Sequence, residues 1–239
     1  MTRGIEERFL RELGPEALLD LQRVASSRPC ILLSGGQLTG KSTVARHAGE
    51  ALHGPAGSSG SVFRHRAEQM GLDIEELAAQ HIAEPKLDVL LDYAAARTIM
   101  AGEVAVFECR LAGALGDLLR RLGRTALVSV HLVCQPAEAA LRFIERRLGR
   151  DARDSLEKRV ALAGSETFGE ALGVLIREPE AAHLCKEARV AVERDERDRS
   201  RLAKLYGAFA WDLADRTIDT THLAPEAVTI AVLAVTHTG

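Results

Sequence analysis

The sequence predicts an α/β protein built on a parallel sheet that helices cover on both faces. Short apolar runs at 29–33, 103–108, 126–134 and 217–219 alternate with segments whose apolar residues have helical spacing. Strands that alternate with helices in this way form parallel sheets rather than hairpins. In such a sheet, ligand sites lie at the carboxyl ends of the strands.

The first helical pattern covers 5–25 and is interrupted by Gly14-Pro15, which predicts two short helices or one kinked helix. We expect residues 1–28 to be an N-terminal helical extension of a domain that spans 29–239. The segment 53–60 is rich in glycine, serine and proline and is predicted to be a loop. The other predicted helical segments are 42–52, 62–100 in three pieces broken at Gly71 and Pro85, 111–122, a helix opened by Gln135-Pro136, 151–205 and 225–235.

Composition excludes several classes of protein. The chain has 239 residues and a formal net charge of −3, so no global positive field favours nucleic acid or an acidic membrane surface. Its four cysteines have no C-x-x-C spacing, which argues against a zinc or redox motif. No signal peptide and no apolar run of membrane-spanning length is visible. We therefore expect a reduced, cytoplasmic enzyme that binds neither nucleic acid nor membrane.

Residues 35–42 match the phosphate-loop pattern G-x-x-x-x-G-K-[ST] and lie between an apolar strand and a helix. Glycines allow successive backbone N–H groups to point inward, and the helix start adds partial positive charge. Lys41 is expected to reach the β- and γ-phosphates, and the Ser42 hydroxyl to bind Mg²⁺. The motif predicts a P-loop NTPase fold. The expected ATP-binding residues are Gly35, Gly36, Gln37, Leu38, Thr39, Gly40, Lys41, Ser42 and Thr43.

Other features narrow the type of P-loop protein. A Ras-like GTPase needs an N-K-x-D segment, and the chain contains no asparagine. A motor ATPase usually has an apolar strand that ends in aspartate, whereas the strand 104–107 ends in Glu108 followed by Cys109-Arg110. This arrangement favours a kinase that acts on a small molecule or a nucleotide.

A kinase with an anionic second substrate needs arginines on separate elements. Arg64 and Arg110 are single candidates, while the segments 142–150 and 194–201 are each rich in arginine. Any of these side chains can alternatively belong to a solvated helix surface. Arg110 is the most informative of them, because it lies at the carboxyl end of a predicted strand.

Taken in order, these segments resemble those of the cytidylate kinases, especially the archaeal-type branch. Residues 58–64 are similar to the family segment S-T-G-x-x-F-R, and 108–113 to E-G-R-L-A-G. Residues 194–201 match R-D-x-x-D-x-x-R, and 218–221 resemble I-D-T-S. The resemblance covers about residues 29–236. Together the segments are far more specific than any one of them.

The resemblance implies a three-layer sandwich around a five-stranded parallel sheet, with an acceptor-binding helical insert at about 60–100 and a helical lid at about 142–194. It implies ATP with Mg²⁺ as the donor and CMP or dCMP as the anionic acceptor. The acceptor-binding residues are then expected to be Ser61, Arg64, Arg110, Arg194, Asp198 and Arg201. The expected catalytic residues are Lys41, Arg142, Arg146 and Arg147, with Mg²⁺ held by Ser42 and, through water, by Glu108.

The chain departs from the family pattern in three places. Cys109 replaces a glycine, the stretch 147–194 is long for a lid, and Leu202 replaces an aromatic residue. Two other functions therefore stay open: a kinase for another acceptor, such as a modified nucleotide, a sugar or an alcohol, and a non-catalytic nucleotide-binding regulator. An alcohol acceptor requires a general base, for which Glu108 and an acidic residue of the helical insert are candidates. The arginine sets argue against the regulator, and the oligomeric state is unknown from the sequence.

Overall fold

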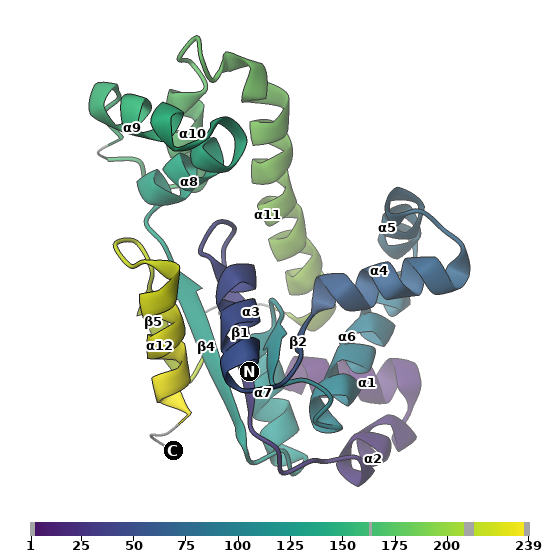
Figure 1. The fold of residues 1–239 in the computed structure, drawn as a ribbon. Helices are drawn as coiled ribbons and strands as arrows, with labels where there is room; N and C mark the ends of the chain where they lie inside the picture. The colour runs from purple at the N-terminus through teal and green to yellow at the C-terminus, as the bar shows by residue number, and fades with distance from the viewer. Residues whose placement is uncertain (1–2, 163, 208–212, 237–239) are drawn as a thin grey trace.

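A five-stranded parallel sheet with the strand order β2-β3-β1-β4-β5 forms the centre of the molecule (Figure 1). The computed structural model describes residues 3–162, 164–207 and 213–236. The first residues of the expected extension 1–28 and the last residues of the expected domain 29–239 therefore lie outside the described ranges. The sheet confirms the predicted parallel α/β architecture. Its strands are β1 (Cys30–Gly35), β2 (Ala56–Ser58), β3 (Val106–Glu108), β4 (Leu127–Val133) and β5 (Arg216–Asp219).

The edge strand β2 lies inside the segment 53–60, so the prediction of a loop there was wrong. β2 consists of Ala56, Gly57 and Ser58, which pair in parallel with Val106–Glu108. Such small residues have little intrinsic preference for a strand and give no apolar pattern to recognise. The strand exists because β3 offers a partner, which is a contact between segments about fifty residues apart in the sequence.

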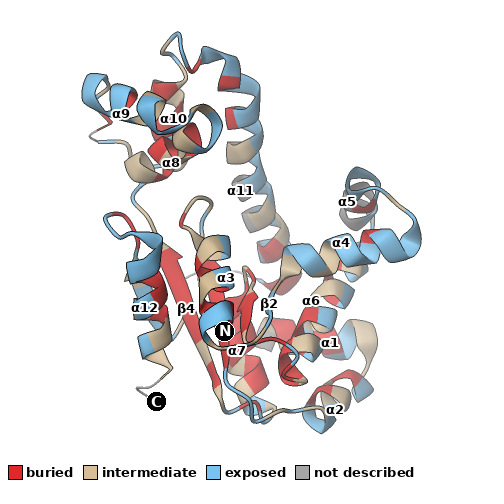
Figure 2. Cartoon of the chain, in the orientation of Figure 1, coloured by how far each residue is buried: buried red, intermediate tan, exposed pale blue. Residues whose placement is uncertain are grey.

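Helices cover the sheet on both faces, so the molecule has three layers (Figure 2). Ile31 and Leu33 of β1 point to one face, where they pack in a hydrophobic cluster with residues of α3 and α12. Cys30 and Leu32 point to the other face and its cluster with α1, α6 and α7. The helices around the sheet are α1 (Arg3–Leu13), α2 (Glu16–Arg23), α3 (Lys41–Ala51), α6 (Pro85–Met100), α7 (Ala112–Arg121) and α12 (Pro225–Val235).

Three helices between β2 and β3 form a side unit that we define as α4 (Ser59–Met70), α5 (Ile74–Ala83) and α6. The breaks occur at the positions that the sequence predicts. Gly71 ends α4 with a φ of 65°, a left-handed conformation that glycine adopts without steric cost. Pro85 occupies the first turn of α6, where its missing N–H costs nothing.

A second group of helices stands above the carboxyl edge of the sheet and forms what we call the upper unit. Side chains from the segment 140–188 form a hydrophobic cluster inside this unit, and it is separate from the two clusters beside the sheet. Helicity throughout 151–205 was a wrong prediction, since 160–162, 164–167 and 176–181 are not helical. The unit contains α8 (Pro136–Leu148), α9 (Arg150–Arg159), α10 (Phe168–Leu175), the short 3₁₀ helix η1 (Ala182–Leu184) and α11 (Cys185–Tyr206).

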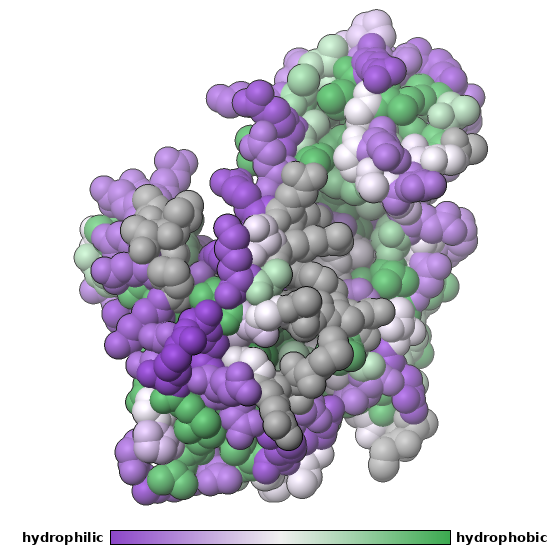
Figure 3. All heavy atoms as spheres, turned by 180° about the vertical axis from the view of Figure 1, so that it is seen from behind, coloured by the Kyte–Doolittle hydropathy of each residue, from purple (hydrophilic) through white to green (hydrophobic). Residues whose placement is uncertain are grey.

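Seen from behind, hydrophobic side chains also gather on the surface of the upper unit, at the upper end of the molecule (Figure 3). Among the helices that the structure describes, none combines the length and the apolar composition that crossing a bilayer requires.

A hydrogen-bonded carboxylate fastens the start of β5 to β4. Asp215 Oδ2 accepts from the N–H and the hydroxyl of Ser129, each at 2.8 Å. Both of its oxygens also accept from the guanidinium of Arg120, at 2.9 and 3.2 Å. Partial burial raises the pKa of Asp215, but the hydrogen bonds from Ser129 and the ion pair with Arg120 outweigh this effect and hold the pKa below its ordinary value.

We predict that Asp215→Asn lowers the free energy of unfolding by about 1–2 kcal/mol at pH 7, because it weakens the four hydrogen bonds that the carboxylate accepts from Ser129 and Arg120. A lowered folded-state pKa stabilises the protein above the unfolded pKa and loses this effect as the pH falls. The difference between wild type and Asp215→Asn should therefore shrink below about pH 4. Urea unfolding at pH 7 and pH 3.5 measures this difference in the free energy of unfolding. Asp154→Asn, at an exposed position, is the control. A difference that is equal at both pH values contradicts the prediction.

Candidate functional site

The phosphate loop follows β1 and ends at the start of α3. Gly35 has a φ of 148°, and a Cβ at this position would lie 2.3 Å from the Leu132 carbonyl oxygen, so only glycine fits against β4. Gly40 caps α3 with a φ of 87° and offers no side chain to the helix N–H groups. The first turn of α3 contains no acidic residue. The backbone therefore leaves an N-terminal helix end suited to an anion.

Two side chains stabilise the shape of the loop from within. The Thr39 hydroxyl, which is buried, donates to the Gly36 carbonyl at 3.0 Å. The Lys41 ammonium donates to the same oxygen at 2.5 Å. Lys41 thus lies folded over the loop, where a phosphate would meet it.

Ser42 and Glu108 come together from two different strand ends. Ser42 opens α3 next to β1, and its hydroxyl donates to Glu108 Oε2 at 2.8 Å. This contact exists because β1 and β3 are parallel neighbours with Leu33 opposite Glu108. Hydroxyl and carboxylate oxygens are ligands that suit Mg²⁺. Within the described ranges, no group of three or more His, Cys, Asp or Glu side chains could hold a metal ion.

An open cavity of about 720 Å³ extends from this pair along α3 to β2 and the first turn of α4. The predicted residues Ser61 and Arg64 line it together with Ser42 and Glu108. Ser61 also completes a capping box with Ser58: the Ser61 N–H donates to Ser58 Oγ at 2.9 Å, and the Ser58 N–H donates to Ser61 Oγ at 3.0 Å. The whole lining is Ser42, Ala45, Arg46, Gly49, Glu50, His53, Gly54, Pro55, Ala56, Gly57, Ser58, Ser61, Arg64 and Glu108.

A second group of charges lies where α11 meets β3 and α6. Arg110 forms an ion pair with Asp198. Arg201 donates to Asp88 at 2.9 Å and to Asp198 at 3.3 Å. Three predicted residues, Arg110, Asp198 and Arg201, are thereby brought into one network. Arg194 has an exposed side chain one helical turn before Asp198.

Asp88 was missed by the sequence analysis. It lies on α6 in a segment whose pattern indicates only an amphipathic helix, and nothing in the local sequence marks it as a partner of α11. The structure buries it, with 6% of its surface exposed, against Arg201. Nearby, Tyr206 donates to Asp92, and burial together with this acidic partner raises the pKa of the Tyr206 hydroxyl.

Arg142 joins the upper unit to the phosphate loop and to the loop after β5. Its guanidinium donates to the Leu38 carbonyl at 3.2 Å and to the Thr220 carbonyl at 2.6 Å. It also forms an ion pair of 2.8 Å with Glu138 one turn earlier in α8. In the loop after β5, hydrogen bonds from the Thr221 hydroxyl and N–H lower the pKa of Asp219.

The other two predicted arginines of this region have no hydrogen bond or ion pair with the described residues of the phosphate loop. Arg146 is exposed on α8. Arg147 pairs with Glu187 of α11, and its guanidinium carbon lies 5.1 Å from the centre of the Phe143 ring. In this conformation, therefore, Arg147 contacts the upper unit itself, and only Arg142 of the three contacts the loop.

No family model matches the chain. A cytidylate kinase of Pyrobaculum arsenaticum is 30% identical over 206 residues, which cover 84% of this chain and 90% of that protein. A cytidylate kinase of Pyrobaculum neutrophilum is 29% identical over 197 residues, or 81% and 85% of the two chains. One from Ignicoccus hospitalis is 27% identical over 200 residues, or 83% and 93%.

These similarities extend over 85–93% of the length of the relatives. The resemblance inferred from short motifs is thus confirmed by full-length similarity: the chain belongs to the cytidylate kinase family.

Proposed function

We propose that this kinase transfers the γ-phosphoryl group of ATP to a nucleoside monophosphate, and that CMP and dCMP are its preferred acceptors. The observation that carries the proposal is the network of Arg110, Asp198 and Arg201 beside the phosphate loop. A donor site needs only the loop, whereas this network provides a second set of guanidinium groups for an anionic substrate. The names of the relatives support cytosine as the base.

The donor half of the site consists of the loop residues 35–43. Backbone N–H groups of the loop and of the α3 N-terminus are proposed to bind the β- and γ-phosphates of ATP. Lys41 then exchanges its bond to the Gly36 carbonyl for a phosphate oxygen. Thr39 maintains the loop shape, since its hydroxyl is bonded within the loop.

Magnesium fits beside Ser42 and Glu108. The Ser42 hydroxyl is proposed to bind the ion directly, and Glu108 to bind it through a water molecule. The ion would neutralise charge on the phosphates. Because Glu108 accepts a hydrogen bond from Ser42, its position suits this role better than that of a general base for an alcohol.

The acceptor half is proposed to consist of Ser61, Arg64, Arg110, Arg194, Asp198 and Arg201. The arginines bind the acceptor phosphate, and Asp198 accepts from sugar hydroxyls. An oxygen of the acceptor phosphate attacks the γ-phosphorus as the bond to the β–γ bridging oxygen breaks, which yields ADP and a nucleoside diphosphate. The attacking oxygen is already anionic, so no general base is needed.

The side unit is proposed as the acceptor-binding insert and the upper unit as the lid. Closure of the lid would bring Arg146 and Arg147 toward the transferred group and exclude water, which otherwise competes as an acceptor. Arg142, with its contact to the loop, is proposed to act with them.

We predict turnover with CMP and dCMP that exceeds turnover with UMP or AMP by at least about tenfold in kcat/KM, a margin equal to about 1.4 kcal/mol of transition-state binding. ADP release across CMP, dCMP, UMP, AMP and a panel of sugars and alcohols measures it. Turnover with an alcohol but with no nucleotide would overturn the proposal. Tight ATP binding without any turnover would favour a regulator instead.

Lys41→Ala is expected to reduce phosphoryl transfer by about 10³-fold or more, because it removes the positive charge nearest the transferred group. Circular dichroism should show an unchanged fold. Lys158→Ala removes an exposed lysine of α9 and serves as the matched control. Wild-type activity in Lys41→Ala would refute the assignment of the loop.

Arg201→Ala is expected to raise the acceptor KM or lower kcat, with an effect of about tenfold or more in kcat/KM and a change of less than about threefold in the Kd for ATP. Arg189→Ala is the control, because Arg189 is on the same helix and is highly exposed. An unchanged acceptor response would show that the 194–201 run is only a charged surface.

A further inference from the structure

The phosphate loop contains a residue in an unfavourable backbone conformation. Leu38 has a φ of 60°, in the left-handed region that favours glycine, and it shares a positive φ with only one other non-glycine residue of the described chain, His53. A side chain in this region clashes with the backbone, so the conformation persists only where surrounding contacts enforce it. The binding of phosphate does not require a leucine side chain at this position.

The Leu38 side chain has a partner in the upper unit. It is half-buried and packs against the hydrophobic cluster of α8 to α11 rather than against either cluster of the sheet. Within the described part of the chain, Leu38 is the residue of the phosphate loop that packs against this cluster. The loop thus extends an apolar side chain into the body that stands above it.

Hydrogen bonds of the same segment reach two different helices of the upper unit. The Leu38 carbonyl accepts from Arg142 of α8 at 3.2 Å. The neighbouring Gln37 amide donates to the Ala191 carbonyl of α11 at 2.7 Å. One apolar contact and two hydrogen bonds therefore join the loop to the upper unit, and the hydrogen bonds reach its first helix, α8, and its last helix, α11.

We propose that Leu38 is a positioning residue that couples the conformation of the phosphate loop to the position of the upper unit. The inference rests on one part of the proposed function, the binding of a nucleoside triphosphate in the phosphate loop. Contacts with the upper unit stabilise the strained loop conformation. A triphosphate that stabilises the same loop conformation therefore shifts the position of the upper unit through Leu38. Coupling of this kind acts equally in both directions.

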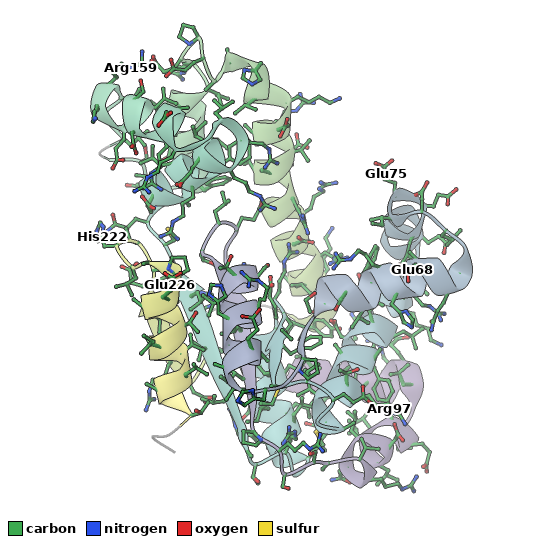
Figure 4. All side chains as sticks on the ribbon, in the orientation of Figure 1. Glu68, Glu75, Arg97, Arg159, His222 and Glu226 are labelled. Atoms are coloured by element: carbon green, nitrogen blue, oxygen red, sulfur yellow. The ribbon has the colours of Figure 1, made fainter. Side chains whose placement is uncertain are left out.

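The coupling is tested by the distance between two spin labels, one on Cys185 at the start of α11 and one on Glu226→Cys at the start of α12. Cys185 is exposed, whereas Cys30 and Cys109 are buried. Figure 4 shows Glu226 at the end of α12 nearest the upper unit. The half-buried Cys134 is replaced by serine in every variant. Distances are measured with and without Mg²⁺ and a non-hydrolysable ATP analogue, with no acceptor present.

In the reference protein, the analogue is expected to shift the distance distribution. Leu38→Gly removes the side chain and also the strain, so the shift, measured at an analogue concentration that saturates the variant, should fall by half or more. Leu38→Ala loses the apolar contact but keeps the strain, so its Kd for the analogue should rise about five- to tenfold. Leu38→Met, which keeps an apolar side chain of similar size, should restore the shift.

Val160→Ala is the matched control, because Val160 packs against the same cluster and is distant in sequence from the loop. It should leave both the shift and the Kd unchanged. A full shift in Leu38→Gly would overturn the proposal, and so would a loss of analogue binding in that variant or no shift in the reference protein. None of these results depends on the acceptor, so a failure of the proposed acceptor specificity is distinguished by the turnover assay.

Discussion

The register of three central strands determines where the chemistry of this protein is located. β1 is hydrogen-bonded to β3 on one side and to β4 on the other, with Leu33 opposite Glu108 and Gly35 opposite Leu132. Hydrophobic layers cover both faces of β1, which makes a shift of register costly because it would turn apolar side chains to the wrong layer. The phosphate loop and Glu108 therefore meet at one edge of the sheet.

The charges of the candidate site are balanced before any substrate arrives. Arg110 and Arg201 share Asp198, and Arg201 also binds Asp88, which is almost fully buried. A partly buried guanidinium without a counterion is unfavourable, so the carboxylates keep the two arginines in place. In the proposed acceptor site, an anionic acceptor would exchange partners with these carboxylates. Such an exchange would discriminate against neutral ligands, which offer no charge to compensate for it.

The sequence predicted the parts of the site that depend on local spacing. The phosphate loop is one such part, since eight consecutive residues and a following helix define it. Arg194, Asp198 and Arg201 are expected site residues from their resemblance to a family segment, and their separations of four and three residues place them on one face of α11. The strands that are buried on both faces were also predictable, as continuous apolar runs.

Other features depend on contacts between segments that are distant in the sequence, and no local sequence pattern predicts them. β2 has no large apolar side chain, and Asp88 is 113 residues from Arg201 in the sequence. The contact of Leu38 with the upper unit and the role of Arg142 as a link between three segments arise only when the chain is folded. Even the positive φ of Leu38 contradicts what a leucine suggests, because the surrounding contacts override its local preference.

The separate hydrophobic cluster of the upper unit has a consequence for how this family tolerates change. Because α8 to α10 and the start of α11 pack around a cluster of their own, we expect residues added to the turns between these helices to leave the clusters beside the sheet intact. The other end of α11 joins one of those sheet clusters through Leu202, Leu205 and Tyr206. The outer turns of the upper unit can therefore lengthen or change in composition more freely than the end of α11 that reaches the sheet.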